Sequence, residues 1–142
     1  MHSALLLGAA LLVVSLVSFA VAIALVVSLM SRVIRTGYSG EGFWKNVAIM
    51  IVVTLVMAAA HLVEIVLWAI VFRASSGIST FEKAFYFSAQ NYTTLGYGDI
   101  VLSDRWRLLG PLEAINGVLL FGLSTAVMFA ALSRLVSGRL HS

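Results

Sequence analysis

The residues with the clearest chemical potential form a short run at positions 93–99, with the sequence TTLGYGD. Glycines alternate there with bulkier residues, so the backbone can adopt positive φ at every second position and turn its carbonyl oxygens to one side. A row of carbonyl oxygens suits a bare monovalent cation. Four such rows around an axis would form stacked oxygen rings that replace the water shell of the ion, and the Thr94 hydroxyl could add a further ring.

This run resembles the selectivity filter of the potassium-channel family, whose motif is Thr-Val-Gly-Tyr-Gly. Thr93 and Asp99 flank the matching residues, as they do in many family members. An ordinary turn would also use glycines, but a short amphipathic segment precedes the run and a long apolar segment lies on each side of it, which favours the filter. The match covers five positions, with leucine where the family usually carries valine: Thr94, Leu95, Gly96, Tyr97 and Gly98.

The resemblance implies a role for each of these residues. The carbonyl oxygens of Thr94, Leu95, Gly96 and Tyr97 are expected to bind K⁺ ions in transit, and no organic cofactor is implied. Asp99 is expected to form an acidic ring at the outer mouth, where it concentrates cations. Because the leucine side chain is larger than valine and must fit behind the filter, a weakly selective cation channel stays open as an alternative.

A short helix is expected immediately before the filter. Ser79 and Glu82 have the spacing of a capping box, so the helix should occupy 80–92, which is too short to cross a membrane. It resembles the family's pore helix, which dips into the membrane and points its negative C-terminal end toward the ion path. Gln90 takes the place where family members often carry an acid that pairs with the aspartate matching Asp99. The amide can still hydrogen-bond there, but no protonated carboxyl pair is available.

The composition indicates that lipid is the solvent for most of the chain. Of its 142 residues 61% are hydrophobic and 11% charged, and a soluble domain of this size could not bury so much apolar surface. There are no cysteines, which excludes disulfides and thiolate metal sites. The net charge is +3, and the basic residues gather at the ends of apolar segments, which favours membrane anchoring over nucleic-acid binding.

Three apolar stretches are long enough to cross a bilayer, which needs about 20 residues. The first has no lysine or arginine before it and is too long for a signal peptide, so retention is expected. The chain therefore resembles small bacterial potassium channels in which one extra helix precedes a two-helix pore unit. The expected fold is an all-α membrane protein. It has an extra N-terminal helix at 1–31, a cytoplasmic linker at 32–46 and a pore domain at 47–142. The pore domain contains an outer helix (47–72), a re-entrant pore helix (80–92), a filter (93–99) and an inner helix (106–135).

Two further patterns concern how these helices pack. Ala20, Ala24 and Ser28 recur at every fourth position of the first helix, which suggests a face for close helix contact or simply the usual abundance of small residues. Trp44 and Trp68 bracket the second span and look like interfacial anchors.

Four polar side chains fall inside the spans, where ionisable groups are costly and need partners. His61 and Glu64 lie in the second span, and Glu113 and Asn116 lie in the third at matching depths. The matching depths suggest one hydrogen-bonded cluster between the outer and inner helices, behind the pore helix. A structural role is favoured over gating or proton sensing.

Two glycines of the inner helix, Gly117 and Gly122, are candidate hinges, because a glycine acts as a hinge in the family. Close packing is the competing explanation for both positions.

One pore loop cannot enclose an axis, so the chain is expected to form a homotetramer among membrane lipids. By resemblance, the N-terminus lies outside a bacterial inner membrane and the C-terminus lies in the cytoplasm. No nucleic-acid partner, soluble regulatory domain or enzymatic activity is expected. The function implied is passive, potassium-selective conduction; a weakly selective channel and a non-conducting regulatory subunit are the alternatives.

Overall fold

The chain folds into three long helices and one short helix. The computed structural model describes residues 2–36 and 42–140, and the helices in this part of the chain are α1 (His2–Arg35), α2 (Phe43–Ser75), α3 (Phe81–Tyr92) and α4 (Leu109–Leu140). Helices α1, α2 and α4 are each long and apolar enough to cross a membrane. The predicted all-α architecture with three spans is therefore confirmed.

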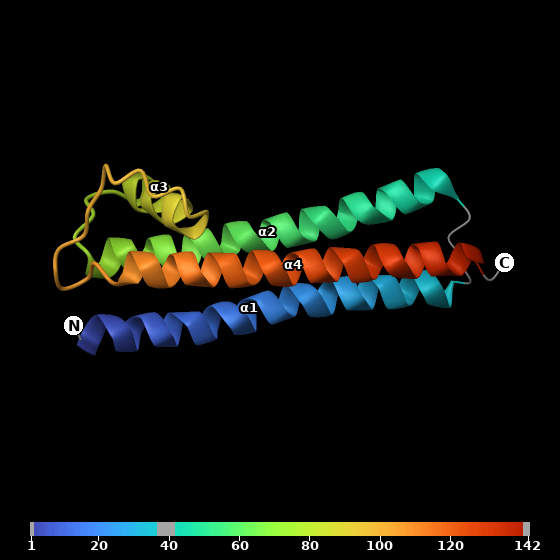
Figure 1. Cartoon of the computed structure of the whole chain (residues 1–142), viewed down its shortest axis with the longest axis horizontal. Helices are drawn as coiled ribbons and strands as arrows, with labels where there is room; N and C mark the ends of the chain where they lie inside the picture. The colour runs from blue at the N-terminus through green and yellow to red at the C-terminus, as the bar shows by residue number, and fades with distance from the viewer. Residues whose placement is uncertain (1, 37–41, 141–142) are drawn as a thin grey trace.

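The three long helices run side by side, and α3 packs against one end of them (Figure 1). Helix α2 is antiparallel to both α1 and α4 (Figure 1). Helices α1 and α3 each contact the α2–α4 pair and lie on opposite sides of it. The N-terminus lies at the α3 end of the bundle and the C-terminus at the other end (Figure 1).

The segment between α1 and α2 is shorter than expected. Instead of a linker over 32–46, α1 continues to Arg35 and α2 already begins at Phe43; positions 37–41 lie outside the described residues. No glycine or proline interrupts 31–35 or 43–46, so both helices can extend beyond the lipid-facing stretch. Arg32 and Arg35 occupy the last turn of α1, where positive charge is favourable beside the helix dipole.

Helix α4 begins at Leu109 and not at 106 as expected, and it continues to Leu140 beyond the expected end at 135. The late start follows from Pro111. In a regular helix the proline ring would clash with the carbonyl of the residue four positions earlier, which is Arg107. Residues 104–108 form turns instead, with the Arg107 N–H donating to the Ser103 carbonyl at 2.9 Å. At the far end, Arg134 ends the apolar stretch without ending the helix, since arginine is a good helix former.

Helix α1 uses a different face for packing than the small-residue stripe suggested. Ala20, Ala24 and Ser28 are exposed in this chain, whereas Phe19, Ala22 and their helical neighbours are buried against α2 and α4. Within one chain the stripe is therefore not a packing face, and the buried face contains larger apolar residues such as Phe19 and Met30, which remove more surface from water or lipid.

The two tryptophans of α2 also have different environments. Trp44 is 79% exposed, as an interfacial anchor would be, but Trp68 is completely buried. The Trp68 indole donates a hydrogen bond to Ser15 Oγ on α1 at 3.3 Å. Trp68 is thus part of the core that joins α1, α2 and α3 and is not an anchor in the lipid headgroups.

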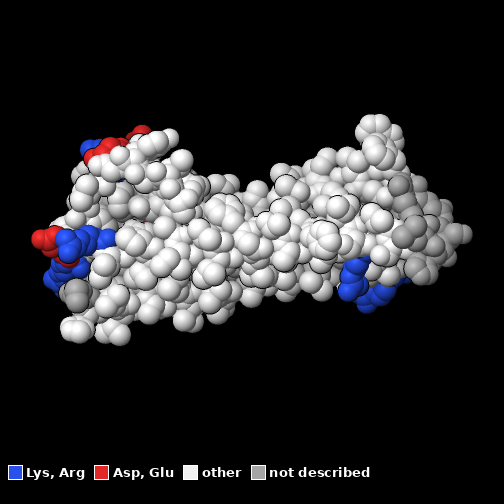
Figure 2. All heavy atoms as spheres, viewed as in Figure 1, with Lys and Arg blue, Asp and Glu red and all other residues white. Residues whose placement is uncertain are grey.

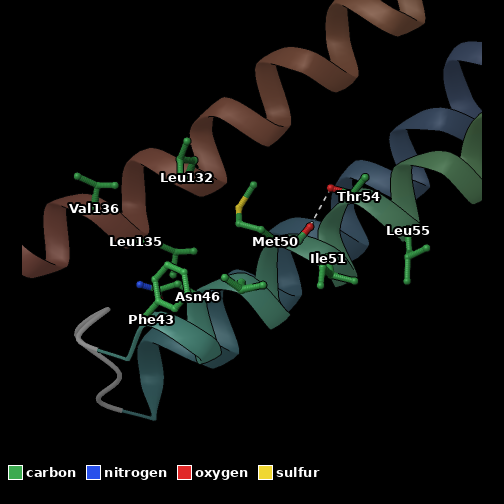
Figure 3. A pocket seen from close by; sticks show the side chains of 10 residues that line it. Phe43, Asn46, Met50, Ile51, Thr54, Leu55, Leu132, Leu135 and Val136 are labelled. Carbon is green, nitrogen blue, oxygen red and sulfur yellow. Dashed lines mark hydrogen bonds between the residues drawn. The ribbon is translucent and has the colours of Figure 1, made fainter.

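Charged side chains gather at the two ends of the bundle, and no charged side chain is seen on the face between them (Figure 2). Large apolar residues are exposed along all three long helices, for example Val17, Leu55 and Val118, each more than 55% exposed. At the end far from α3, a groove of about 500 Å³ lies between α2 and α4 (Figure 3). This pattern is that of an integral membrane protein, with apolar surface for lipid or for further copies of the chain.

Candidate functional site

The short helix α3 brings the predicted filter to the end of the bundle. Its N-cap is Thr80, whose hydroxyl accepts a hydrogen bond from the Lys83 N–H at 3.3 Å. The capping box predicted from Ser79 and Glu82 is therefore wrong by one residue. Thr80 adopts the extended conformation that an N-cap requires (φ −132°, ψ 154°), and the residue three positions after it is Lys83.

The C-terminal end of α3 is pressed against α4. A Cβ added to Gly117 would overlap the carbonyl oxygen of Tyr92, the last residue of α3. Gly117 is therefore a close-contact position, because only glycine lets the two backbones approach so near. Around Gly122, by contrast, a Cβ would have nothing within 4 Å. Of the two candidate hinges, only Gly122 is free of packing within this chain.

Directly after α3 the backbone alternates in conformation. Thr94, Gly96 and Gly98 have φ of 62°, 54° and 76°. The glycine spacing predicted this alternation at the two glycines, and Thr94 extends it by one position. Threonine is β-branched, so a positive φ at Thr94 is strained. Such a conformation persists only where surrounding contacts stabilise it.

Gln90, near the end of α3, holds this segment in place by hydrogen bonds. Its backbone carbonyl accepts hydrogen bonds from the N–H groups of Leu95 at 2.8 Å and Gly96 at 3.3 Å. Its side-chain oxygen accepts from the Tyr97 N–H at 3.1 Å, and its side-chain nitrogen donates to Asp99 Oδ1 at 3.1 Å. One residue thus makes four bonds to positions 95–99. The contact with Tyr97 could not be predicted, because it depends on the path of the loop.

Asp99 lies at the exposed end of the segment. Desolvation raises its pKa, but hydrogen bonds from the side chains of Gln90 and Tyr86 and from backbone N–H groups outweigh this, so the pKa of Asp99 lies below its usual value. The carboxylate is therefore ionised at neutral pH. Among the functional contacts, Tyr86 was missed by sequence reasoning, since an aromatic run in α3 gave no signal for a bond to an acid.

The rest of the segment is open in a single chain. Thr93 through Asp99 are all exposed, with Leu95 at 60% and Tyr97 at 67%. Thr93 alone has its hydroxyl bonded back into α3, where it donates to the Ala89 carbonyl at 2.7 Å. Contacts within the chain therefore determine the backbone conformation of this segment, whereas they leave the side chains of Leu95 and Tyr97 exposed.

The four intramembrane polar side chains do not form the single cluster that was expected. Glu64, Glu113 and Asn116 are at most 1% exposed, and His61 is half-buried. No hydrogen bond joins any two of these four in the described chain. Serine and tyrosine hydroxyls from other helices reach the three ionisable groups first: Ser18 bonds Glu64, Ser88 bonds Glu113 at 2.5 Å, and Tyr92 and Ser124 bond His61. The side-chain nitrogen of Asn116 has no hydrogen-bond partner among the described residues.

His61 connects the end of α3 to α4. Tyr92 Oη lies 2.7 Å from His61 Nδ1, and Ser124 Oγ lies 3.2 Å from His61 Nε2. Because Ser124 donates its one proton to the Phe121 carbonyl at 2.9 Å, it must accept from the ring, so His61 carries its proton on Nε2 and accepts from Tyr92. Sequence depth alone pointed to Asn116 as the nearest partner of His61 and missed Tyr92 and Ser124.

Comparisons with known proteins agree with this geometry. The model of a family described as ion channel matches residues 49–134. Among curated proteins, the voltage-gated potassium channel Kch of Escherichia coli (strain K12) is 38% identical over 71 residues, which are 46% of this chain and 17% of Kch. The chain thus aligns with only a small part of that relative. No solved structure matches.

Proposed function

This chain belongs to the ion channel family, which makes it a channel and not an enzyme, and we propose that four copies form a potassium-selective pore. K⁺ would pass through rings of backbone carbonyls from Thr94, Leu95, Gly96 and Tyr97, with Gly98 closing the row. The permeant ion is the substrate, and the reaction is passive transfer with no covalent step.

The observation that carries the proposal is the alternation of positive φ at Thr94, Gly96 and Gly98. Alternation of this kind turns successive carbonyls toward one side, which is the arrangement that can replace the hydration shell of a cation. The hydrogen bonds of Gln90 hold this conformation from within the same chain. A segment that is held by such bonds loses less conformational entropy when it binds an ion, which favours fast and repeated binding.

Two features support assembly around an axis. Leu95 and Tyr97 are exposed in the single chain although both are large and apolar, so further copies would give them packing partners. Asp99 is ionised at the end of the same segment, and four such carboxylates would concentrate cations at the mouth. A homotetramer in contact with membrane lipids accounts for both.

In the proposed orientation, α3 and residues 93–99 face outward and α3 forms a re-entrant pore helix. The C-terminus and the α1–α2 connection lie in the cytoplasm of a bacterial inner membrane, and the N-terminus lies outside. This orientation follows from the family and not from charge, because four basic side chains that the structure describes lie at each end of the bundle: Arg32, Arg35, Lys45 and Arg134 far from α3, and Arg73, Lys83, Arg105 and Arg107 near it.

A weakly selective cation channel is the second candidate, and Leu95 is the observation that favours it. Its side chain is larger than the valine usual in the family. If that side chain packs poorly between copies, the carbonyl rings widen and discrimination between K⁺ and Na⁺ falls.

The test is the reversal potential of purified protein in planar bilayers between KCl and NaCl solutions. A reversal near the potassium equilibrium potential, with block by barium, is expected; a reversal near zero would support the weakly selective candidate. Gly98→Ala is the control, because an added side chain at φ 76° is strained and should abolish the current if these carbonyls carry it. A protein that folds and inserts but never conducts would contradict both and favour a non-conducting subunit.

A further inference from the structure

A groove between α1 and α4 lies toward the end of the bundle far from α3. Its floor is apolar and buried, since Val26, Met30 and Ala131 are at most 5% exposed. Val27 also lines the groove and is 56% exposed, so the groove is open at its rim. Because α1 and α4 are both long and apolar enough to cross a membrane, the groove opens to lipid along most of its length.

The lining of this groove changes from apolar to polar along its length. Helices α1 and α4 run in the same direction, so in both of them the higher residue numbers lie nearer the end far from α3 (Figure 1). Val26 and Val127 line the groove toward the middle of the bundle, and Ser31 and Arg134 line it toward that end. The same order, from hydrocarbon to polar groups, is found from the middle of a bilayer to its surface. The groove therefore matches a molecule with an apolar tail and a polar head.

Arg134 supplies the charge at the polar end of the groove. Its side chain is exposed and forms no hydrogen bond or ion pair with another residue that the structure describes. Every acidic residue in the described ranges, 2–36 and 42–140, lies in the half of the bundle nearer α3: Glu64, Glu82, Asp99, Asp104 and Glu113. The described part of a neighbouring copy in the same orientation would bring only further positive charge to this end. An anion from outside the chain is therefore the partner that fits Arg134.

We propose that this groove binds the anion of a fatty acid from the bilayer. The carboxylate lies at Arg134, whose planar guanidinium can donate to both carboxylate oxygens. The alkyl chain lies over the apolar floor and points to the middle of the membrane. With about 190 Å³, the groove is smaller than the roughly 300–1,000 Å³ of sites for drug-sized molecules. It therefore suits one alkyl chain better than the two chains of a phospholipid.

The head of the ligand decides the affinity of such a site. An alkyl chain in the bilayer is already in an apolar solvent, so its transfer to an apolar groove gains little free energy. Hydrogen bonds between two charged groups are stronger than neutral ones, and the attraction between the charges is larger at the edge of a low-dielectric bilayer than in water. A fatty-acid anion should therefore bind, whereas an alcohol of the same chain length should bind much more weakly.

Photolabelling of the whole wild-type protein in phosphatidylcholine vesicles tests the site. The probe is laurate with a diazirine near the end of its chain; light expels N₂, and the carbene inserts into a neighbouring bond. Peptide mapping by mass spectrometry should find the label on residues of the groove such as Val26 and Val127. Unlabelled laurate at about ten times its dissociation constant should reduce this labelling about tenfold, since only unoccupied sites bind the probe. Dodecanol at the same concentration, which has no charge, should not reduce it.

Three variants separate the groove from the general positive charge of this end. Arg134→Gln keeps a polar side chain without the charge, and it should reduce labelling about tenfold or more because charge-assisted bonds are lost. Arg32→Gln is the matched control, since it removes one charge at the same end from a residue that does not line the groove. It should change labelling by about twofold at most at 0.15 M salt, which screens exposed charges beyond about 8 Å. Ala130→Phe adds a ring in the groove and keeps Arg134, and it should also block labelling.

Four outcomes overturn the proposal. A groove without label means that something else, such as a neighbouring copy, covers it. Equal losses for Arg134→Gln and Arg32→Gln mean that only the surface charge of this end holds the probe. Equal competition by dodecanol means that the carboxylate contributes nothing, and stronger competition by phosphatidylglycerol than by laurate means that a two-chain lipid is the occupant. None of these measurements reads ionic current, so their result is independent of the proposed pore function.

Discussion

The two ends of the bundle contain different kinds of contact. At the α3 end, directional bonds fix the backbone: Gln90 makes four hydrogen bonds to positions 95–99, and Gly117 lies directly against the Tyr92 carbonyl. At the other end, a groove of about 500 Å³ separates α2 and α4, with walls that are almost entirely apolar (Figure 3).

The difference teaches which part of the molecule can change shape at low cost. Hydrogen bonds and backbone contacts are lost abruptly when atoms move by an ångström, whereas apolar side chains around a groove can slide and repack. We therefore expect the α3 end to behave as a rigid unit and the groove end to accommodate movement of α4, with Gly122 between them free to bend. The following substitutions test this contrast.

The largest effect is expected for Gly117→Ala. The new Cβ would overlap the Tyr92 carbonyl, and because this neighbour is backbone it cannot rotate away. We expect a loss of about 3 kcal/mol or more in the free energy of unfolding, at the upper end of the range for overpacked sites. Urea unfolding in detergent micelles measures it.

Gly122→Ala is the matched control for this substitution, since it adds the same methyl group to the same helix in open space. It should be neutral or slightly stabilising, because alanine favours the helix by about 1 kcal/mol over glycine. Equal losses for the two variants would contradict the idea that α4 is tightly held only near α3.

Gln90→Leu should have the next largest effect. It removes the acceptor of the Tyr97 N–H and a donor to Asp99, while the backbone bonds of residue 90 can remain. With two hydrogen bonds lost, we expect about 1–3 kcal/mol less stability, and a lower permeability ratio of K⁺ over Na⁺ in the bilayer measurement.

Gln90→Glu separates the two bonds. An ionised glutamate still accepts from Tyr97 but repels Asp99, whose carboxylate stays ionised because its pKa lies below the usual value. As the pH falls, the new carboxyl takes up a proton, can donate to Asp99 and should restore selectivity. If selectivity does not depend on pH in this variant, the bond to Asp99 does not matter for the filter.

A smaller effect is expected for Tyr92→Phe, which removes one hydroxyl and leaves the ring in place. His61 Nδ1 then loses its donor, for an expected cost of about 1 kcal/mol. Ser124→Ala removes the bond on the other side of the same ring and serves as the control. If His61 couples α4 to the end of α3, the losses of the double variant will not be additive in unfolding measurements.

How much of the structure could be predicted from the sequence depended on the separation, along the chain, of the residues that contact one another. The three spans and the positive φ at Gly96 and Gly98 follow from local composition and from the missing Cβ of glycine, so they could be predicted. The partners of His61 and Glu64 could not, because Ser124 and Ser18 are 63 and 46 positions away and any nearby hydroxyl would have served. The prediction that Trp68 is an interfacial anchor was wrong for the same reason. The burial of Trp68 depends on where α1 packs, and no local pattern in α2 indicates this.

The smallest effect is expected at the groove end, for Leu132→Phe. Leu132 lines the groove and is 46% exposed, so a larger ring can turn into open space without displacing backbone. We expect the free energy of unfolding to stay within about 0.5 kcal/mol of wild type, as for ordinary surface positions, and the K⁺ over Na⁺ permeability ratio to be unchanged. A marked loss would mean that a neighbouring copy fills the groove in the assembled channel, so that this end is as tightly packed as the filter end. A changed permeability ratio would mean instead that the two ends are coupled through α4, and the contrast between them would then be one of degree.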